Sequence, residues 1–193
     1  MDIDIDLADR TQLMKLVRHV PASNIKDGVV GKHPTGVYFQ HIPTDPLSRL
    51  SAVDYRTAEG LGFFKIDLLN VHVYQQVKDD EHLTRLMAQE PLWELLQTRE
   101  FVDQVIHING HYDSILAMPE PITSINHLAM FLAILRPAKK HLIGKLWAEV
   151  EKTVWLKSED GKFGFKRSHS IAYAHLAVVH MNLLCEQLLN PLD

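Results

Sequence analysis

Three aspartates alternate with aliphatic residues over residues 2–7. In a β-strand this period of two sends Asp2, Asp4 and Asp6 to one face, in succession about 6.6 Å apart. Carboxylates held this close repel one another unless a cation binds there, and Mg²⁺ prefers carboxylate, water and phosphate oxygens. The spacing indicates a site for phosphoryl or nucleotidyl transfer, with a solvated acidic strand face as the alternative interpretation.

A fourth aspartate, Asp67, lies inside the apolar run over residues 63–69. In a strand the apolar side chains of this run point to one face, which leaves Lys65 and Asp67 on the other. An unpaired carboxylate is costly to bury, so Asp67 needs a partner. Two interpretations stay open: a salt bridge with Lys65 or another base, or a third ligand for metal ions held by the first strand.

The elements that position these acids form the first part of an α+β fold. We expect strands at residues 2–7, 36–40 and 62–68, and a helix capped by Asp9 directly after the first strand. These strands predict a small mixed sheet in a first region, residues 1–78.

The second region, residues 79–193, has an almost wholly helical pattern. Pro91 fits the first position of a helix. Ser124 is the expected N-cap of an apolar helix that the Arg136-Pro137 step ends. Two further helices are expected over about 140–155 and 170–189.

The composition is that of a folded globular protein: 46% of the residues are hydrophobic and 23% are charged. The formal net charge of −4 argues against a uniformly basic nucleic-acid coat but leaves room for a local basic patch. Cys185 is the sole cysteine, so an intrachain disulfide is excluded. The N-terminus lacks the pattern of a targeting peptide, and the longest apolar stretch, residues 128–135, is too short to span a membrane. We therefore expect a cytoplasmic protein with no membrane partner.

Five separated segments resemble the catalytic core of the bacterial DNA polymerase III α subunit, in the same order along the chain. They are residues 2–6 (Asp-Ile-Asp-Ile-Asp), 31–37 (Gly-Lys-His-Pro-Thr-Gly-Val), 61–69 (Leu-Gly-Phe-Phe-Lys-Ile-Asp-Leu-Leu), 132–137 (Leu-Ala-Ile-Leu-Arg-Pro) and 163–174 (Phe-Gly-Phe-Lys-Arg-Ser-His-Ser-Ile-Ala-Tyr-Ala). The resemblance implies a palm of the nucleotidyltransferase type, as in polymerase β, followed by a shortened fingers-like region. The stretches 71–122 and 138–160 match the family poorly or are much shortened.

The resemblance also implies roles for individual residues. Asp2, Asp4 and Asp67 would hold two Mg²⁺ ions on adjoining strands, with Asp6 as a spare acid. The nucleotide- or DNA-binding residues would be Lys32, Arg136, Lys166, Arg167 and His169. DNA and deoxynucleoside triphosphates are the implied partners, because guanidinium and ammonium groups suit phosphate oxygens.

Two classes of function follow from the resemblance. The first is a replication protein derived from a two-metal DNA polymerase. We expect the family's preceding palm segment, with its Gly-Ser turn, to be absent, so synthesis would require a second chain that supplies it. The second is a noncatalytic module that keeps the polymerase fold for binding DNA or a protein. A third interpretation, a decaying gene fragment, predicts poor folding.

His107 and His111 flank the turn at Asn109-Gly110 and could suggest a metal pair. A turn between them spoils the helical spacing that such a pair needs, and no cysteine ligands accompany them. A zinc site is therefore not expected at these residues. Four further histidines lie at helical or strand positions, where packing residues are the more common case: His72, His169, His175 and His180.

Overall fold

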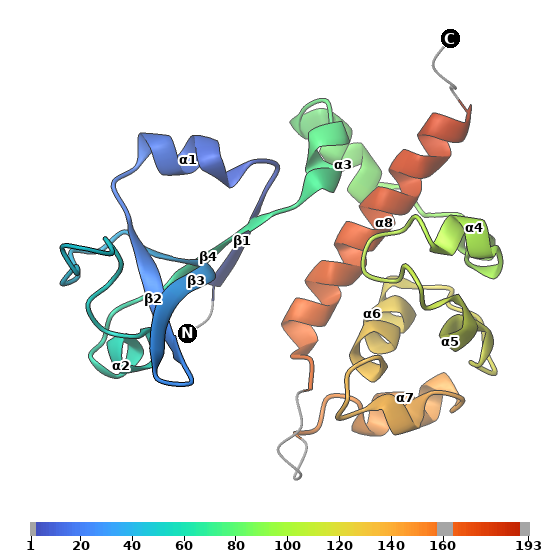
Figure 1. The fold of residues 1–193 in the computed structure, drawn as a ribbon. Helices are drawn as coiled ribbons and strands as arrows, with labels where there is room; N and C mark the ends of the chain where they lie inside the picture. The colour runs from blue at the N-terminus through green and yellow to red at the C-terminus, as the bar shows by residue number, and fades with distance from the viewer. Residues whose placement is uncertain (1–2, 158–163, 190–193) are drawn as a thin grey trace. The chain divides into compact units, whose positions relative to one another are not determined.

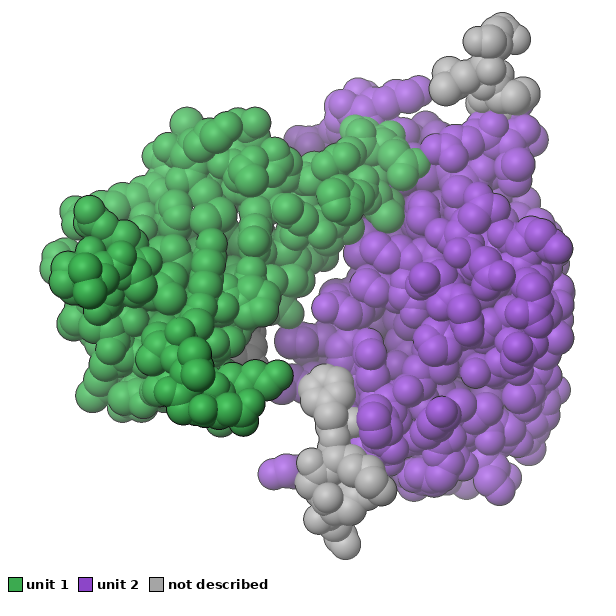
Figure 2. Space-filling model, in the orientation of Figure 1, with its two compact units in different colours: residues 1–77 green, residues 78–193 purple. Residues whose placement is uncertain are grey.

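The computed structural model of the protein describes residues 3–157 and 164–189. The chain forms two compact units, unit 1 over residues 1–77 and unit 2 over residues 78–193 (Figures 1 and 2). Unit 1 contains the β-sheet, and the elements described in unit 2 are helices. Asp2, a predicted metal ligand, lies outside the described residues.

Unit 1 is built on a mixed four-stranded sheet with the strand order β1-β4-β3-β2. The strands are β1 (Ile3–Leu7), β2 (Val20–Lys26), β3 (Val29–Tyr38) and β4 (Ile66–Asn70). β1 pairs with β4 in parallel, whereas the β2–β3 and β3–β4 pairs are antiparallel. The α+β class expected from the sequence is confirmed.

The three predicted strands are present, but the bounds of two of them differ from the prediction. β1 agrees with the alternating segment at residues 2–7, whereas β3 begins seven residues before position 36 and β4 begins at Ile66 rather than at 62. β2 was missed, because Pro21 and Asn24 weaken its strand signal. The turn at Asp27-Gly28, with φ of 52° and 78°, closes the β2–β3 hairpin, and Asp-Gly is a sequence signal for such a turn.

Three short helices complete unit 1: α1 (Arg10–Leu16), α2 (Tyr55–Gly60) and the 3₁₀ helix η1 (His72–Gln76). The Asp9 carboxylate accepts a hydrogen bond from the Thr11 N–H at 2.8 Å, which confirms the predicted cap of α1. Ala58 of α2 packs into a buried cluster with Ala22, Tyr38 and Ile42, so α2 covers part of the sheet.

The secondary-structure elements described in unit 2 are helices. They are α3 (Asp80–Ala88), η2 (Trp93–Gln97), α4 (Arg99–Val102), α5 (Tyr112–Leu116), α6 (Ile125–Ile134), η3 (Lys140–Leu142), α7 (Trp147–Thr153) and α8 (Arg167–Leu189). The Ser124 hydroxyl accepts from the His127 N–H, and α6 ends before Arg136, both as predicted. The continuous helix predicted over 140–155 is wrong, because the chain breaks at Gly144, which has a φ of 87°.

The core of unit 2 lies where α6 and α8 pack together (Figure 1). Every residue from 128 to 134 of α6 is buried, so this helix is apolar on all sides, as an interior helix must be. The buried Ser170 hydroxyl of α8 donates to the Ala129 carbonyl oxygen of α6 at 2.6 Å. This bond pairs a polar group that would otherwise be costly to bury.

No helix in the described ranges is both long enough and apolar enough to cross a membrane.

Asn182 should contribute strongly to the stability of unit 2. Its side chain is 1% exposed, and Nδ2 donates to the carbonyl oxygens of Leu86 and Gln89 at the end of α3, both at 2.9 Å. We expect Asn182→Ala to lower the free energy of unfolding by about 2–3 kcal/mol, because the buried Leu86 carbonyl and the partly buried Gln89 carbonyl lose their donor. Urea unfolding followed by circular dichroism measures this.

Asn109→Ala is the matched control, since Asn109 is exposed. It should change the free energy of unfolding by less than about 0.5 kcal/mol. Equal stability of the two variants would show that Asn182 does not hold α3 to α8.

Candidate functional site

The register of β1 against β4 places Asp4 directly opposite Asp67. Neighbouring strands lie about 4.8 Å apart, and paired residues of a parallel ladder project to the same face. The structure thus brings together two of the acids that were expected on adjoining strands. Asp6 lies two residues further along β1, opposite Leu69.

The Asp67 carboxylate is paired with groups of the protein itself. Its Oδ2 forms an ion pair with the Lys65 ammonium, and its Oδ1 accepts a hydrogen bond from the Thr35 hydroxyl at 2.7 Å. Both charged side chains are largely buried, with 13% of Lys65 and 14% of Asp67 exposed. This is the salt bridge that the sequence left open as one of two interpretations. It satisfies the buried carboxylate without a metal ion.

The backbone near His33 leaves room for the Lys65 side chain. Gly36 lies opposite Asp67 in the β3–β4 ladder, and a Cβ at Gly36 would be 2.7 Å from Lys65 Cδ. A side chain at position 36 would therefore force Lys65 or His33 to shift. The His33 Nδ1 accepts a hydrogen bond from the Gly36 N–H at 2.9 Å. This bond holds residues 33–36 in place, where β3 bulges out of its register with β2.

The His33 imidazole adds no positive charge to the acids. Burial and then the Lys65 ammonium lower the pKa of His33, against an opposing effect of Asp67. Its Nδ1 acts as an acceptor toward the Gly36 N–H, in agreement with a neutral ring. The Tyr55 ring lies edge-on to the His33 ring, with 5.1 Å between their centroids. It covers the Lys65 end of the Lys65–Asp67 ion pair.

The metal site expected from Asp2, Asp4 and Asp67 stays a prediction, because Asp2 lies outside the described residues. No group of three or more histidine, cysteine, aspartate or glutamate side chains in the described ranges is placed to hold a metal ion. Asp4 and Asp67 are the neighbouring pair, and Asp67 is engaged by Lys65. Burial and the nearby Asp4 raise the pKa of Asp6, which disfavours its charged form.

A second group of functional side chains, the Arg136 cluster, lies in unit 2 and comprises His107, Arg136, Phe165, His169 and Tyr173. The Arg136 guanidinium carbon lies 4.6 Å from the centroid of the Phe165 ring. Phe165 meets the rings of His169 and Tyr173 edge-on, and the His107 ring stacks on Tyr173 with centroids 4.3 Å apart. The cluster joins the end of α6 to the first turns of α8.

Two nitrogens of the Arg136 cluster are buried without a hydrogen-bond partner in the described chain: Nε of Arg136 and Nε2 of His107. Buried polar atoms are nearly always paired, so two such atoms in one cluster point to a missing acceptor or donor. The backbone of His107 also adopts a φ of 69°, which is uncommon outside glycine and recurs at functional sites.

The electrostatic surroundings of the Arg136 cluster are positive. Burial and then the Arg136 guanidinium lower the pKa of His107 to about 4. Burial, Arg136 and Lys140 lower the pKa of the neighbouring His111. In both cases burial is the larger cause, and the positive charges of Arg136 and, for His111, Lys140 add to it.

The nucleotide-binding residues proposed from the sequence are only partly brought together. Arg136 and His169 share the cluster through Phe165. Arg167 instead lies over the Trp155 ring, 6.0 Å from its centroid, and Lys166 is exposed just before α8. Lys32 belongs to unit 1, where it is exposed on β3.

The sequence analysis missed the participation of His107, Phe165 and Tyr173. Phe165 and Tyr173 lie in the segment that resembles the family, so their proximity to His169 was a usable signal. His107 was weighed only as a zinc ligand, and nothing in its local sequence predicts that it stacks on an aromatic ring of α8.

Comparisons with protein-family models, with curated proteins and with solved structures found no match to this chain.

The pKa of His107 predicts a pH-dependent stability. The ring titrates near 6.5 in the unfolded chain and near 4 in the folded one, so the unfolded state binds more protons between these values. Stability should therefore fall as the pH drops from about 6.5 toward 4, with His107 contributing on the order of 2 kcal/mol. Urea unfolding at pH 7, 6 and 5 tests this.

His107→Phe, which keeps a stacking ring without a titrating group, should flatten that dependence. His180→Phe is a useful comparison, because burial also lowers the pKa of His180. The His180 Nδ1 in addition accepts a hydrogen bond from the Ile106 N–H. His180→Phe should flatten the slope too, while also lowering stability at pH 7. An unchanged slope in His107→Phe would disprove the role assigned to His107.

Proposed function

We propose that this protein binds the phosphates of DNA or of a nucleotide through the Arg136 cluster, in a fold related to the DNA polymerase III α subunit. The observation that carries this proposal is the pair of buried, unpartnered nitrogens of Arg136 and His107 beside an aromatic group. Phosphate oxygens are acceptors that a guanidinium can bind through two parallel hydrogen bonds.

The Arg136 cluster has the chemistry of a nucleotide site. Phe165 fixes the plane of the guanidinium from one side, which preorganises its donors. The His107–Tyr173 stack shows that flat rings pack side by side in this cluster, as a nucleobase on a protein ring does. Lys140 adds a positive charge near His111, and the neutral His111 ring can donate one hydrogen bond.

For unit 1 we propose the role of a noncatalytic palm-type sheet of the nucleotidyltransferase kind. The Lys65–Asp67 ion pair supports this, because it takes up the carboxylate that a catalytic Mg²⁺ would need. In this proposal the protein is a cytoplasmic module of DNA replication that keeps the polymerase fold for binding.

Metal-dependent nucleotidyl transfer is the second candidate function. The register that sets Asp4 opposite Asp67 favours it, since carboxylates on adjoining strands are the arrangement that two-metal enzymes use. Lys65 would have to leave Asp67 before an ion could bind there.

DNA binding should depend on Arg136. We expect a fluorescein-labelled primer–template to bind wild-type protein with a clear salt dependence, and Arg136→Ala to weaken binding roughly tenfold. The slope of log affinity against log salt should fall by about one, as loss of one phosphate contact predicts. Fluorescence anisotropy at several salt concentrations gives both quantities.

Arg99→Ala is the matched control. Arg99 also lies over an aromatic ring, Tyr112 at 4.5 Å, but it is ion-paired with Asp113. It should bind DNA like the wild type. Arg136→Ala with wild-type affinity and slope would refute phosphate binding by the cluster.

Removal of Lys65 tests the second candidate. If Asp4 and Asp67 form a latent cation site, Lys65→Met should raise the affinity for Mn²⁺ by roughly tenfold or more, because the competing ammonium is gone. Titration followed by electron paramagnetic resonance measures free Mn²⁺. Lys65→Met with Asp67→Asn should lose that gain, and absence of Mn²⁺ binding in Lys65→Met would exclude the two-metal candidate.

A further inference from the structure

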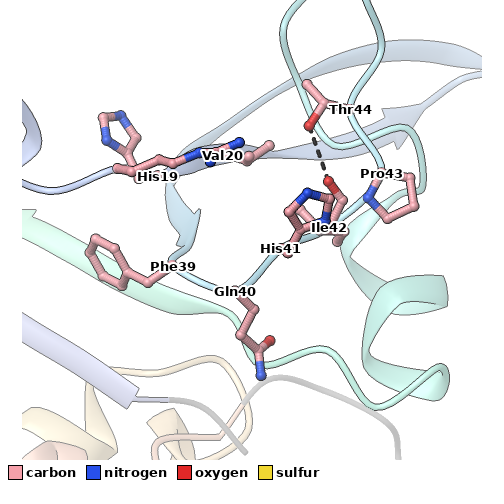
Figure 3. Close-up of a pocket in the computed structure, with 9 residues that line it drawn as sticks. His19, Val20, Phe39, Gln40, His41, Ile42, Pro43 and Thr44 are labelled. Atoms are coloured by element: carbon pink, nitrogen blue, oxygen red, sulfur yellow. Dashed lines mark hydrogen bonds between the residues drawn. The ribbon is translucent and has the colours of Figure 1, made fainter.

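Unit 1 contains a cavity of about 340 Å³ that takes no part in the site described above. Its lining includes Arg18 and His19 just before β2, Val20 at the start of β2, and Phe39, His41 and Ile42 after β3. All of these but Arg18 are labelled in Figure 3. These two segments are brought together by the β2–β3 pairing, in which Val20 lies opposite Tyr38. The volume is in the range of small-molecule sites, roughly 300–1,000 Å³.

The polar lining of this cavity is basic. Arg18, His19 and His41 contribute to it, and none of the residues that line it is acidic. Within the described chain, the side chains of Arg18 and His41 make no hydrogen bond or ion pair. Arg18 brings a positive charge to a lining that contains no acidic residue, which favours an anionic ligand.

The hydrogen bond of His19 determines which ring nitrogen a ligand can use. The His19 Nδ1 lies 3.0 Å from the Val17 carbonyl oxygen, which can only accept, so Nδ1 carries a proton. This leaves Nε2 free to accept a hydrogen bond from an O–H of a ligand.

Other polar side chains of the lining are already used inside the protein. The Gln40 Oε1 accepts the Phe64 N–H at 2.7 Å, and its side chain extends away from His19 (Figure 3). The Thr44 hydroxyl donates to the Ile42 carbonyl oxygen at 3.1 Å. Recognition of a charged ligand therefore falls to the arginine and the two histidines.

The remaining walls are apolar and include a ring. Phe39 is 36% exposed, which is unusual for a large aromatic side chain, and it lies on the same side of the close-up as His19 (Figure 3). Val20 and Ile42 add aliphatic surface. The cavity is larger than an inorganic phosphate needs, so a ligand that fills it has an organic body.

We infer that this cavity binds a small organic phosphate whose body is a planar ring, with the phosphate at Arg18, His19 and His41 and the ring against Phe39. It is a separate site from the Arg136 cluster, and it does not depend on the function proposed for that cluster.

Phenyl phosphate is the probe for this site, titrated into the full chain and followed by two-dimensional NMR of labelled side chains and amides. Resonances of His19, Phe39 and His41 should shift together and saturate. Inorganic phosphate, which lacks the ring, and phenol, which lacks the charge, should each bind roughly tenfold more weakly or worse.

Arg18→Ala should weaken phenyl phosphate binding roughly tenfold, since a charge-assisted contact is lost. His41→Gln should also weaken it. Lys15→Ala removes the same charge from exposed α1, away from the cavity, and should bind like the wild type. Arg136→Ala should likewise leave this site unchanged, which separates it from the unit 2 cluster.

Three results would overturn the inference: wild-type affinity in Arg18→Ala, inorganic phosphate binding as tightly as phenyl phosphate, or shifts confined to residues around His107 and Tyr173. The last result would leave the inferred cavity empty while it supported phosphate binding by unit 2.

Discussion

A carboxylate cannot remain unpaired in the middle of a packed sheet, and unit 1 is organised around this constraint. Asp67 sits on β4, the strand that pairs with both β1 and β3. Its charge is balanced by Lys65 from its own strand and by the Thr35 hydroxyl from β3. Gly36 leaves the space that the lysine crosses. Removing one of the two charges would leave the other unpaired in a largely buried site. An unpaired buried charge strongly destabilises the folded protein.

In unit 2 the charged Arg136 side chain packs against rings instead of an opposite charge. The Arg136 guanidinium has an aromatic ring beneath it and two histidines with lowered pKa values beside it. Within the described chain its Nε has no acceptor. A protein that only needed stability would supply a carboxylate here, as Glu186 does for Arg85 and His82 on the opposite end of α8. The contrast between the two ends of one helix is the physical basis for assigning ligand binding to the Arg136 cluster.

Local sequence rules predicted the elements whose determinants lie within a few residues. The alternation over 2–7, the caps Asp9 and Ser124, and the stop before Pro137 depend on near neighbours, and the structure confirms them. The predictions were wrong where the signal is spread over paired segments. β2 is recognisable only beside β3, and the expected helix over 140–155 is divided at Gly144.

The sequence by itself determined which residues could do chemistry: alternating acids on one strand face, a carboxylate in an apolar run, and a basic segment at the start of the last helix. It left the partner of Asp67 open, because Lys65 and a metal ion both satisfy a buried carboxylate. The tertiary structure pairs Asp67 with Lys65 and, through the β3–β4 pairing, brings Thr35 and Gly36 to it. It alone also stacked His107 on Tyr173 and placed Arg18 and His41 in the lining of one cavity, since residues far apart in sequence come together only when the chain packs.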